Sequence, residues 1–136
     1  MMTTARRQLR LSIRRGTFAI VQLRPGEQLP SWATGGDFFS VTRTADELSI
    51  VVEESRVPAG LRSQTGWRVV KVHGPFELTE VGVLASLAAP LAEAGVSLFV
   101  LSTFDTDYLL VSTESLASAI ASLKDAGHVF LPTERC

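Results

Sequence analysis

The chain has 136 residues, of which 46% are hydrophobic and 20% are charged, and its formal net charge at pH 7 is −1. This composition excludes a disordered polar chain and indicates a globular protein. The apolar runs, such as residues 96–101, are far shorter than the roughly 20 residues that a membrane-spanning helix needs. We therefore expect a cytoplasmic protein that does not enter a membrane and whose overall charge does not attract nucleic acid.

Cys136 is the only cysteine, so neither an intrachain disulfide nor a multi-cysteine metal site can form. Arginines crowd the start of the chain, at positions 6, 7, 10, 14 and 15. Such a cluster can contact phosphate or RNA, can steer an acidic partner, or can form a solvated tail and first strand. No aromatic or glycine-rich nucleic-acid motif accompanies it, which favours the solvated tail.

Short alternating or apolar runs predict strands in the first half of the chain. Apolar and polar residues alternate over 9–13, and 18–23 is a second apolar run. The segment 29–36 is interrupted by Pro and Gly and has room for at most one helical turn. Residues 38–43 and 48–53 then predict a β-hairpin with a polar turn between its strands.

In the second half, a strand over 67–73 precedes a predicted helix over 80–94. Thr79 suits the N-cap of this helix, and Gly95 suits its C-terminal stop. Pro90 lies inside the helix, where the lost hydrogen bond and the steric clash normally cost about 3 kcal/mol. We therefore expect a kink or a shortened helix.

Two apolar runs around a Ser/Thr/Asp cluster predict a second hairpin over 98–111. Apolar residues at helical spacing follow within 112–127, and residues 128–131 form a last predicted strand. The second half thus reads strand, helix, strand, strand, helix, strand. This order is the split β-α-β arrangement of ferredoxin-like folds.

The hairpin over 98–111 resembles the earlier hairpin when the two are aligned at an offset of 60, with Thr42 opposite Ser102 and Glu47 opposite Asp107. Internal sequence similarity of this kind indicates two copies of one supersecondary unit. The first copy is shorter, and its helices are expected to be reduced to turns. We predict an α+β fold of two tandem ferredoxin-like (βαββαβ) units. The predicted boundaries are 1–62 for the truncated N-terminal unit and 63–136 for the complete C-terminal unit.

The polar cluster of the second hairpin is a candidate binding site for a free amino acid. Such a ligand needs an acceptor for its ammonium group, which Asp107 offers, and donors for its carboxylate. The N–H groups at the start of the helix over 80–94 can supply those donors. Alternatively, Asp105 and Asp107 only form the hairpin turn, because Asp and Thr bond their own backbone in turns.

Catalytic motifs are missing from the sequence. His73 and His128 are isolated histidines at predicted strand ends, and there is no glycine-rich phosphate loop and no Gly-x-Ser-x-Gly motif. The sequence therefore predicts no enzyme, no metal site and no cofactor. Trp32 and Trp67 are expected in the core or at an interface, although Trp32 could also line the ligand pocket.

Three segments resemble the ACT-domain family, specifically the tandem type that includes the CASTOR arginine sensors. They are Phe-Phe-Ser-Val-Thr-Arg-Thr at 38–44 with Glu-Leu-Ser-Ile-Val at 47–51, Gly-Val-Leu-Ala-Ser-Leu-Ala-Ala-Pro-Leu-Ala at 82–92, and Ser-Thr-Phe-Asp-Thr-Asp-Tyr at 102–108. The resemblance extends from about Leu9 to the end of the chain. This chain differs from the CASTOR pattern in having two units instead of four, with a truncated first unit.

The resemblance implies a regulatory module that binds an amino acid or a similar small molecule and that catalyses nothing itself. In the CASTOR type the ligand lies between two ACT units, against the start of the first helix and the Ser-Thr-Phe-x-x-Asp hairpin. Carried over to this sequence, the implied ligand-binding residues are Thr103, Phe104, Asp107, Glu80, Val81, Gly82 and Val83. An alternative is a ligand-free interaction module that oligomerises through sheet edges. In either case an unpaired edge predicts a homodimer.

Overall fold

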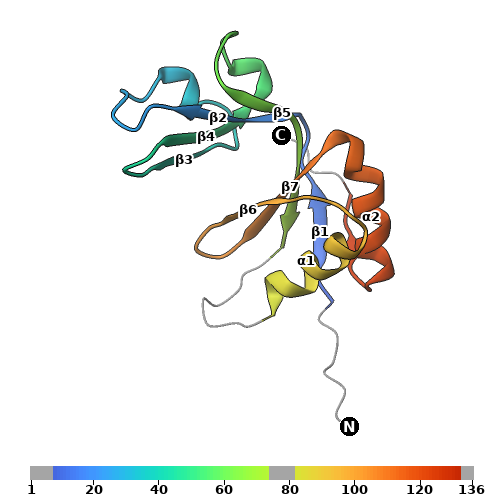
Figure 1. The fold of residues 1–136 in the computed structure, drawn as a ribbon. Helices are drawn as coiled ribbons and strands as arrows, with labels where there is room; N and C mark the ends of the chain where they lie inside the picture. Colours follow the sequence, from blue (N-terminus) through green and yellow to red (C-terminus); the bar gives the residue numbers. More distant parts are fainter. Residues whose placement is uncertain (1–7, 74–81, 133–136) are drawn as a thin grey trace. The chain divides into compact units, whose positions relative to one another are not determined.

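The computed structural model describes residues 8–73 and 82–132 (Figure 1). They form two compact units, which within the described ranges are 16–67 and 8–15 with 68–132. We call them the N-terminal unit and the C-terminal unit. The first strand therefore belongs to the C-terminal unit, whereas the predicted boundaries place it in the N-terminal one. No helix among the described residues is long and apolar enough to cross a membrane.

The N-terminal unit is an antiparallel sheet with short 3-10 turns where a complete ferredoxin-like unit has helices. Its elements are β2 (Phe18–Leu23), η1 (Ser31–Thr34), β3 (Ser40–Arg43), β4 (Leu48–Glu53), η2 (Glu54–Arg56) and the first part of β5 (Ser63–Val72). The strand order is β3-β4-β2-β5, so the last strand pairs with the first. Residues 18–23 and 48–53 form strands with the predicted bounds.

One face of this sheet carries the core of the N-terminal unit. Alternating residues of β2 and β4 are buried on it together with Ala33 of η1, because successive side chains of a strand point to opposite faces. Trp32 packs against this core and also lines a shallow hollow of about 440 Å³ within the same unit. Trp32 is half-buried and packs against this core, in agreement with the core prediction, and the alternative that it lines the ligand pocket stays a prediction.

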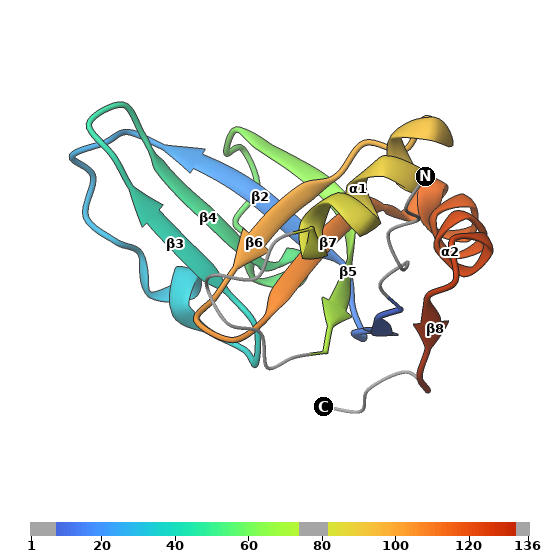
Figure 2. The same ribbon diagram turned by 90° about the horizontal axis from the view of Figure 1, so that it is seen from below.

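The C-terminal unit contains two helices and five paired strands. Its elements are β1 (Arg10–Ile13), the second part of β5, α1 (Val83–Glu93), β6 (Phe99–Ser102), β7 (Asp107–Ser112), η3 (Thr113–Ser115), α2 (Leu116–Asp125) and β8 (Val129–Phe130). The order across the sheet is β6-β7-β5-β1-β8. Figure 2 shows the β6–β7 hairpin and β8 at opposite edges of this unit.

Strand β1 changes the order of strands in the C-terminal unit. In the N-terminal unit the fourth strand pairs directly with the first, but here β1 lies between β5 and β8. It is antiparallel to β5 and parallel to β8. No pattern in the sequence predicts this insertion. It joins the first described residues of the chain to the last described ones.

Both helices cover the same face of the C-terminal sheet (Figure 1). Apolar residues alternate on β1, β5 and β7 and pack against Leu87 and Leu91 of α1 and Leu123 of α2. The opposite face, which we call the helix-free face, carries residues such as Arg10, Ser12 and Lys71. Two layers, helices on a sheet, thus form one core.

The predicted helices are present with shorter bounds. Helix α1 begins at Val83 and continues past Pro90 to Glu93, while the predicted N-cap Thr79 lies outside the described residues. Because α1 continues three residues past Pro90 and ends one residue before the predicted end at 94, Pro90 does not shorten the helix as expected. Before α2, the hydroxyl of Ser112 accepts a hydrogen bond from the Ser115 N–H at 3.2 Å and so caps the 3-10 turn η3.

Candidate ligand-binding site

The hairpin turn between β6 and β7 is held by Thr103. Its backbone N–H donates to the carbonyl of Thr106 at 2.8 Å, and its hydroxyl donates to the same carbonyl at 3.0 Å. The next residue, Phe104, is 79% exposed. The Thr103 hydroxyl, a predicted ligand contact, thus donates its hydrogen bond within the turn. Phe104, the next predicted contact, has a ring that is open to a ligand.

Asp107 lies on the face of the sheet that the helices cover. The register of the hairpin places Ser102 opposite Asp107 and Val100 opposite Leu109. Leu109 and Val111 belong to the core under the helices, and alternate residues of a strand share a face. The half-buried carboxylate of Asp107 therefore stands at the edge of this core, with the Ser102 side chain beside it. Sequence reasoning missed Ser102, which only the pairing register reveals.

The first hairpin shows which residue Asp107 replaces. There Arg43 pairs with Leu48, and a four-residue connection joins the strands as in the second hairpin. The equivalent residues are therefore 59 apart (107 − 48), and the predicted offset of 60 is wrong by one residue. A shift of one residue moves every side chain to the other face of a sheet. The counterpart of Asp107 is the fully buried core residue Leu48, not Glu47.

The start of α1 offers unpaired donors. The first helical hydrogen bond runs from the Ser86 N–H to the Gly82 carbonyl at 3.0 Å, so the N–H groups of residues 83–85 have no acceptor within the helix. Gly82 adopts a left-handed conformation with φ of 86°. Val83 is buried in the core, so only its backbone can meet a ligand. Glu80 and Val81 lie outside the described residues.

Replacing Gly82 by alanine is expected to lower the free energy of unfolding by about 1 kcal/mol, because a side chain is disfavoured at positive φ. Among the described residues, a Cβ atom at this position meets no atom within 4 Å, so the expected cost is strain in the backbone. Urea denaturation measures the change. A loss of several kcal/mol would contradict the open surroundings of this glycine.

The hairpin turn and the start of α1 lie toward the same end of the C-terminal unit in both views (Figures 1 and 2). Asp107 and Ser102 supply a carboxylate and a hydroxyl, and the helix start supplies N–H donors with the positive end of the helix dipole. A carboxylate binds an ammonium group, and a helix N-terminus binds a carboxylate. The arrangement is suited to a zwitterion.

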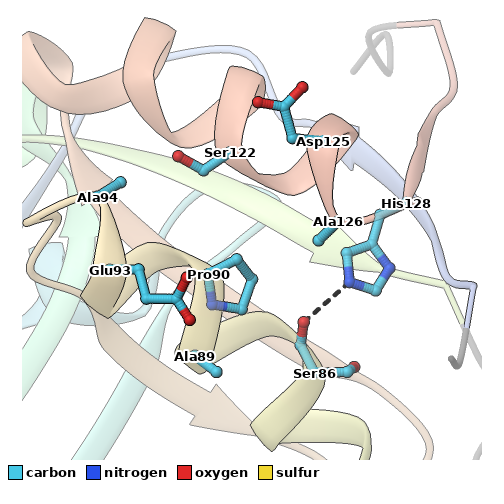
Figure 3. Close-up of a pocket in the computed structure, with 9 residues that line it drawn as sticks. All are labelled: Ser86, Ala89, Pro90, Glu93, Ala94, Ser122, Asp125, Ala126 and His128. Atoms are coloured by element: carbon cyan, nitrogen blue, oxygen red, sulfur yellow. Dashed lines mark hydrogen bonds between the residues drawn. The ribbon is translucent and has the colours of Figure 1, made fainter. Parts of the chain in front are cut away.

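A second hollow of about 530 Å³ lies between α1 and α2 and contains none of the predicted ligand contacts (Figure 3). His128 closes one side of it and is 4% exposed. Its Nδ1 accepts from the Leu9 N–H at 3.1 Å, which leaves the proton on Nε2, and Nε2 donates to the Ser86 carbonyl at 2.9 Å. That carbonyl lies four residues before Pro90, which has no N–H to offer it. His128 thus has a structural role.

Comparisons with known proteins agree with this fold. Residues 62–125 match the family model of the ACT domain, and a second model, for an N-terminal domain, matches residues 16–60. The C-terminal unit is therefore an ACT domain. The chain belongs to the ACT-domain family and is of the CASTOR-like type, and the predicted α+β ferredoxin-like class is confirmed.

The human cytosolic arginine sensor for mTORC1 subunit 1 is 34% identical over 95 residues, which are 64% of this chain and 29% of that protein. The chain thus spans less than a third of the length of this curated relative. A solved structure from Agobacterium tumefaciens is 41% identical with a TM-score of 0.89, covering 95% of this chain and 96% of that one. The regulatory subunit of aspartate kinase from Thermus thermophilus shares the fold at 11% identity, with a TM-score of 0.62 over 86% of this chain and 97% of its own.

Proposed function

We propose that this protein is a regulatory sensor domain that binds a free amino acid at the helix-side end of the β6–β7 hairpin and that it catalyses no reaction. The observation that carries the proposal is Asp107 on the helix-covered face, in the place where the N-terminal unit has the buried Leu48. The proposed contacts are the side chains of Asp107, Ser102 and Phe104 and the backbone at 82–83. Thr103, Glu80 and Val81, the other positions predicted from the sequence, are also part of the proposed site.

A carboxylate at the edge of a core is a poor choice for stability alone. Partial removal of an ionised group from water costs free energy unless a partner compensates it, whereas a leucine there would gain by burial. The ammonium group of an amino acid is such a partner. Its carboxylate would then accept hydrogen bonds from the N–H groups at the start of α1.

The family supports a regulatory role, since the human relative is named as a cytosolic arginine sensor and the Thermus relative as a regulatory subunit. We propose a cytoplasmic location on the same ground. The proposal names an amino acid as the ligand class and does not carry arginine over from a protein of which this chain spans under a third. It requires no cofactor, no metal and no nucleic acid.

A thermal-shift screen of the twenty common amino acids at millimolar concentration tests the proposal. A ligand that binds only the folded state stabilises it, by about 2.7 kcal/mol at a hundred times its dissociation constant. We expect at least one amino acid to raise the melting temperature of the parent protein. Asp107→Asn should remove that rise, and Asp105→Asn in the exposed turn should keep it. A screen in which no amino acid stabilises the parent refutes the proposal.

The alternative is an interaction module without a ligand, which the exposed edge of the C-terminal sheet favours. Strand β6 pairs only with β7 in the described part of the chain, and an edge strand can pair with a second molecule. We propose a homodimer in either case. Light scattering on dilute protein tests it, and a strictly monomeric protein would exclude this edge as a stable interface. Dimerisation with no response to any amino acid would favour the alternative function.

A further inference from the structure

The hollow of about 530 Å³ between α1 and α2, which we call the interhelical hollow, has the size of a small-molecule site. Such sites measure about 300–1,000 Å³ and often lie between packed helices. Its walls are the facing sides of the two helices, and His128 closes it on one side (Figure 3). None of the contacts proposed for the amino acid lines it.

Small side chains line most of the interhelical hollow and leave room for a ligand. They are Ala89, Ala94, Ala126, Ser86 and Ser122. Both serine hydroxyls already donate to backbone carbonyls of their own helices, at 2.7 and 2.9 Å. Together with the ring of Pro90, these side chains therefore offer mainly apolar contacts.

Two carboxylates line the hollow from opposite walls. Glu93 lies on α1 and Asp125 on α2, and both are exposed (Figure 3). Among the described residues, neither carboxylate takes part in a hydrogen bond or an ion pair. The His128 ring does not compensate these charges, because its Nδ1 accepts and its Nε2 donates, as in a neutral imidazole. The residues that line the hollow thus carry two negative charges and no positive one.

The helix ends add to this negative potential. Glu93 is the last residue of α1, and Asp125 is the last residue of α2. The negative end of a helix dipole and the terminal carbonyl groups disfavour a carboxylate at this position and favour a cation. The last turn of α1 contains no basic residue, and Lys124 in the last turn of α2 does not line the hollow. Both positions are therefore poor for stability and suited to a cationic ligand.

We propose that the interhelical hollow binds a small organic amine with two cationic groups on an alkyl chain. One ammonium group pairs with Glu93 and the other with Asp125, on opposite walls. The alkyl chain lies against the alanines and Pro90, which an inorganic dication cannot use. The proposal does not rest on the amino acid site, because the two sites share no residue.

Calorimetry on the whole protein with the diamines putrescine and cadaverine tests the site at constant ionic strength. We expect saturable binding of at least one diamine, and weaker binding of the monoamine butylamine and of Mg²⁺. Glu93→Gln and Asp125→Asn should each weaken diamine binding by about fivefold, the upper end for an ion pair in contact with solvent. Glu114→Gln is the matched control, because Glu114 is an exposed carboxylate of the same unit outside the hollow.

A second pair of variants tests the space without changing the charge. Ala89→Leu places a large side chain in the hollow and should weaken diamine binding by at least about tenfold. Ala85→Leu makes the same change at an exposed position of α1 that does not line the hollow, and it should bind the diamine as the parent does. Thermal unfolding of each variant without ligand shows that the fold is kept.

The proposal is overturned if no diamine binds more tightly than Mg²⁺, or if Glu114→Gln weakens binding as much as Glu93→Gln does. A trilysine peptide that binds more tightly than both diamines would overturn the small-molecule assignment in favour of a basic protein partner. Asp107→Asn should leave diamine binding unchanged, so failure of this site and failure of the amino acid site are distinguishable.

Discussion

Alanine in place of His128 is expected to lower the free energy of unfolding by about 3 kcal/mol. The imidazole joins the Leu9 N–H before β1 to the Ser86 carbonyl in α1, and it is 4% exposed. Its removal leaves a buried donor and a buried acceptor unsatisfied, each of which costs about 1–3 kcal/mol. Urea denaturation measures the loss. Ser122→Ala, a change at a half-buried position in the same hollow, should be nearly neutral.

A double-mutant cycle with Pro90→Ala isolates the cause. An alanine at position 90 restores the N–H that donates to the Ser86 carbonyl, so His128 is no longer its only donor among the described residues. We expect His128→Ala to cost about 1–2 kcal/mol less in the Pro90→Ala background than in the parent. Equal costs in the two backgrounds would show that the histidine does not compensate for the proline.

Leucine in place of Asp107 is expected to abolish amino acid binding while it stabilises the fold by about 1 kcal/mol. The substitution gives the C-terminal unit the residue that the N-terminal unit has at the equivalent position, Leu48. An apolar side chain that can be buried replaces a half-buried carboxylate, and the acceptor for the ammonium group is lost. Melting temperatures with and without the amino acid found in the screen measure both effects.

The opposite signs of these two effects make the test specific. A substitution that damages the fold lowers binding and stability together. Replacing a residue that serves function at a cost to stability instead yields a variant that is more stable and does not bind. Ser102→Ala, on the neighbouring strand, should weaken binding less than Asp107→Leu because it removes one neutral hydroxyl. If Asp107→Leu binds the amino acid as well as the parent does, Asp107 is not a ligand contact.

Local patterns were sufficient to predict most elements. Short apolar runs predicted β2 and β4 with the bounds observed, and apolar residues at helical spacing predicted α1 and α2. Residues 63–66, which lie before the predicted strand over 67–73, instead begin the ten-residue strand β5. These residues are polar, and their strand conformation depends on pairing with β2 and on the Glu54 carboxylate, which accepts from the Gly66 N–H at 2.7 Å. Such partners are distant in sequence and leave no local pattern.

The candidate site was predicted only in part. Asp107 can be identified from its residue type and its place in the hairpin. The face of the sheet to which it points depends on the alignment of the two hairpins, and the similar apolar strands leave that alignment uncertain by one residue. That same register is needed to find Ser102. His128 looks like an isolated histidine in the sequence, because its two partners lie 119 and 42 residues away.

The insertion of β1 between β5 and β8 has a consequence for the order of folding. On the ribosome, residues 8–15 emerge before the rest of the described chain, but their neighbours on both sides are made later, and β8 is made more than a hundred residues after them. The C-terminal sheet can close only when the whole ACT domain has left the exit tunnel. Contacts of such long sequence separation slow folding, so we expect the N-terminal unit, whose pairings are more local, to form first.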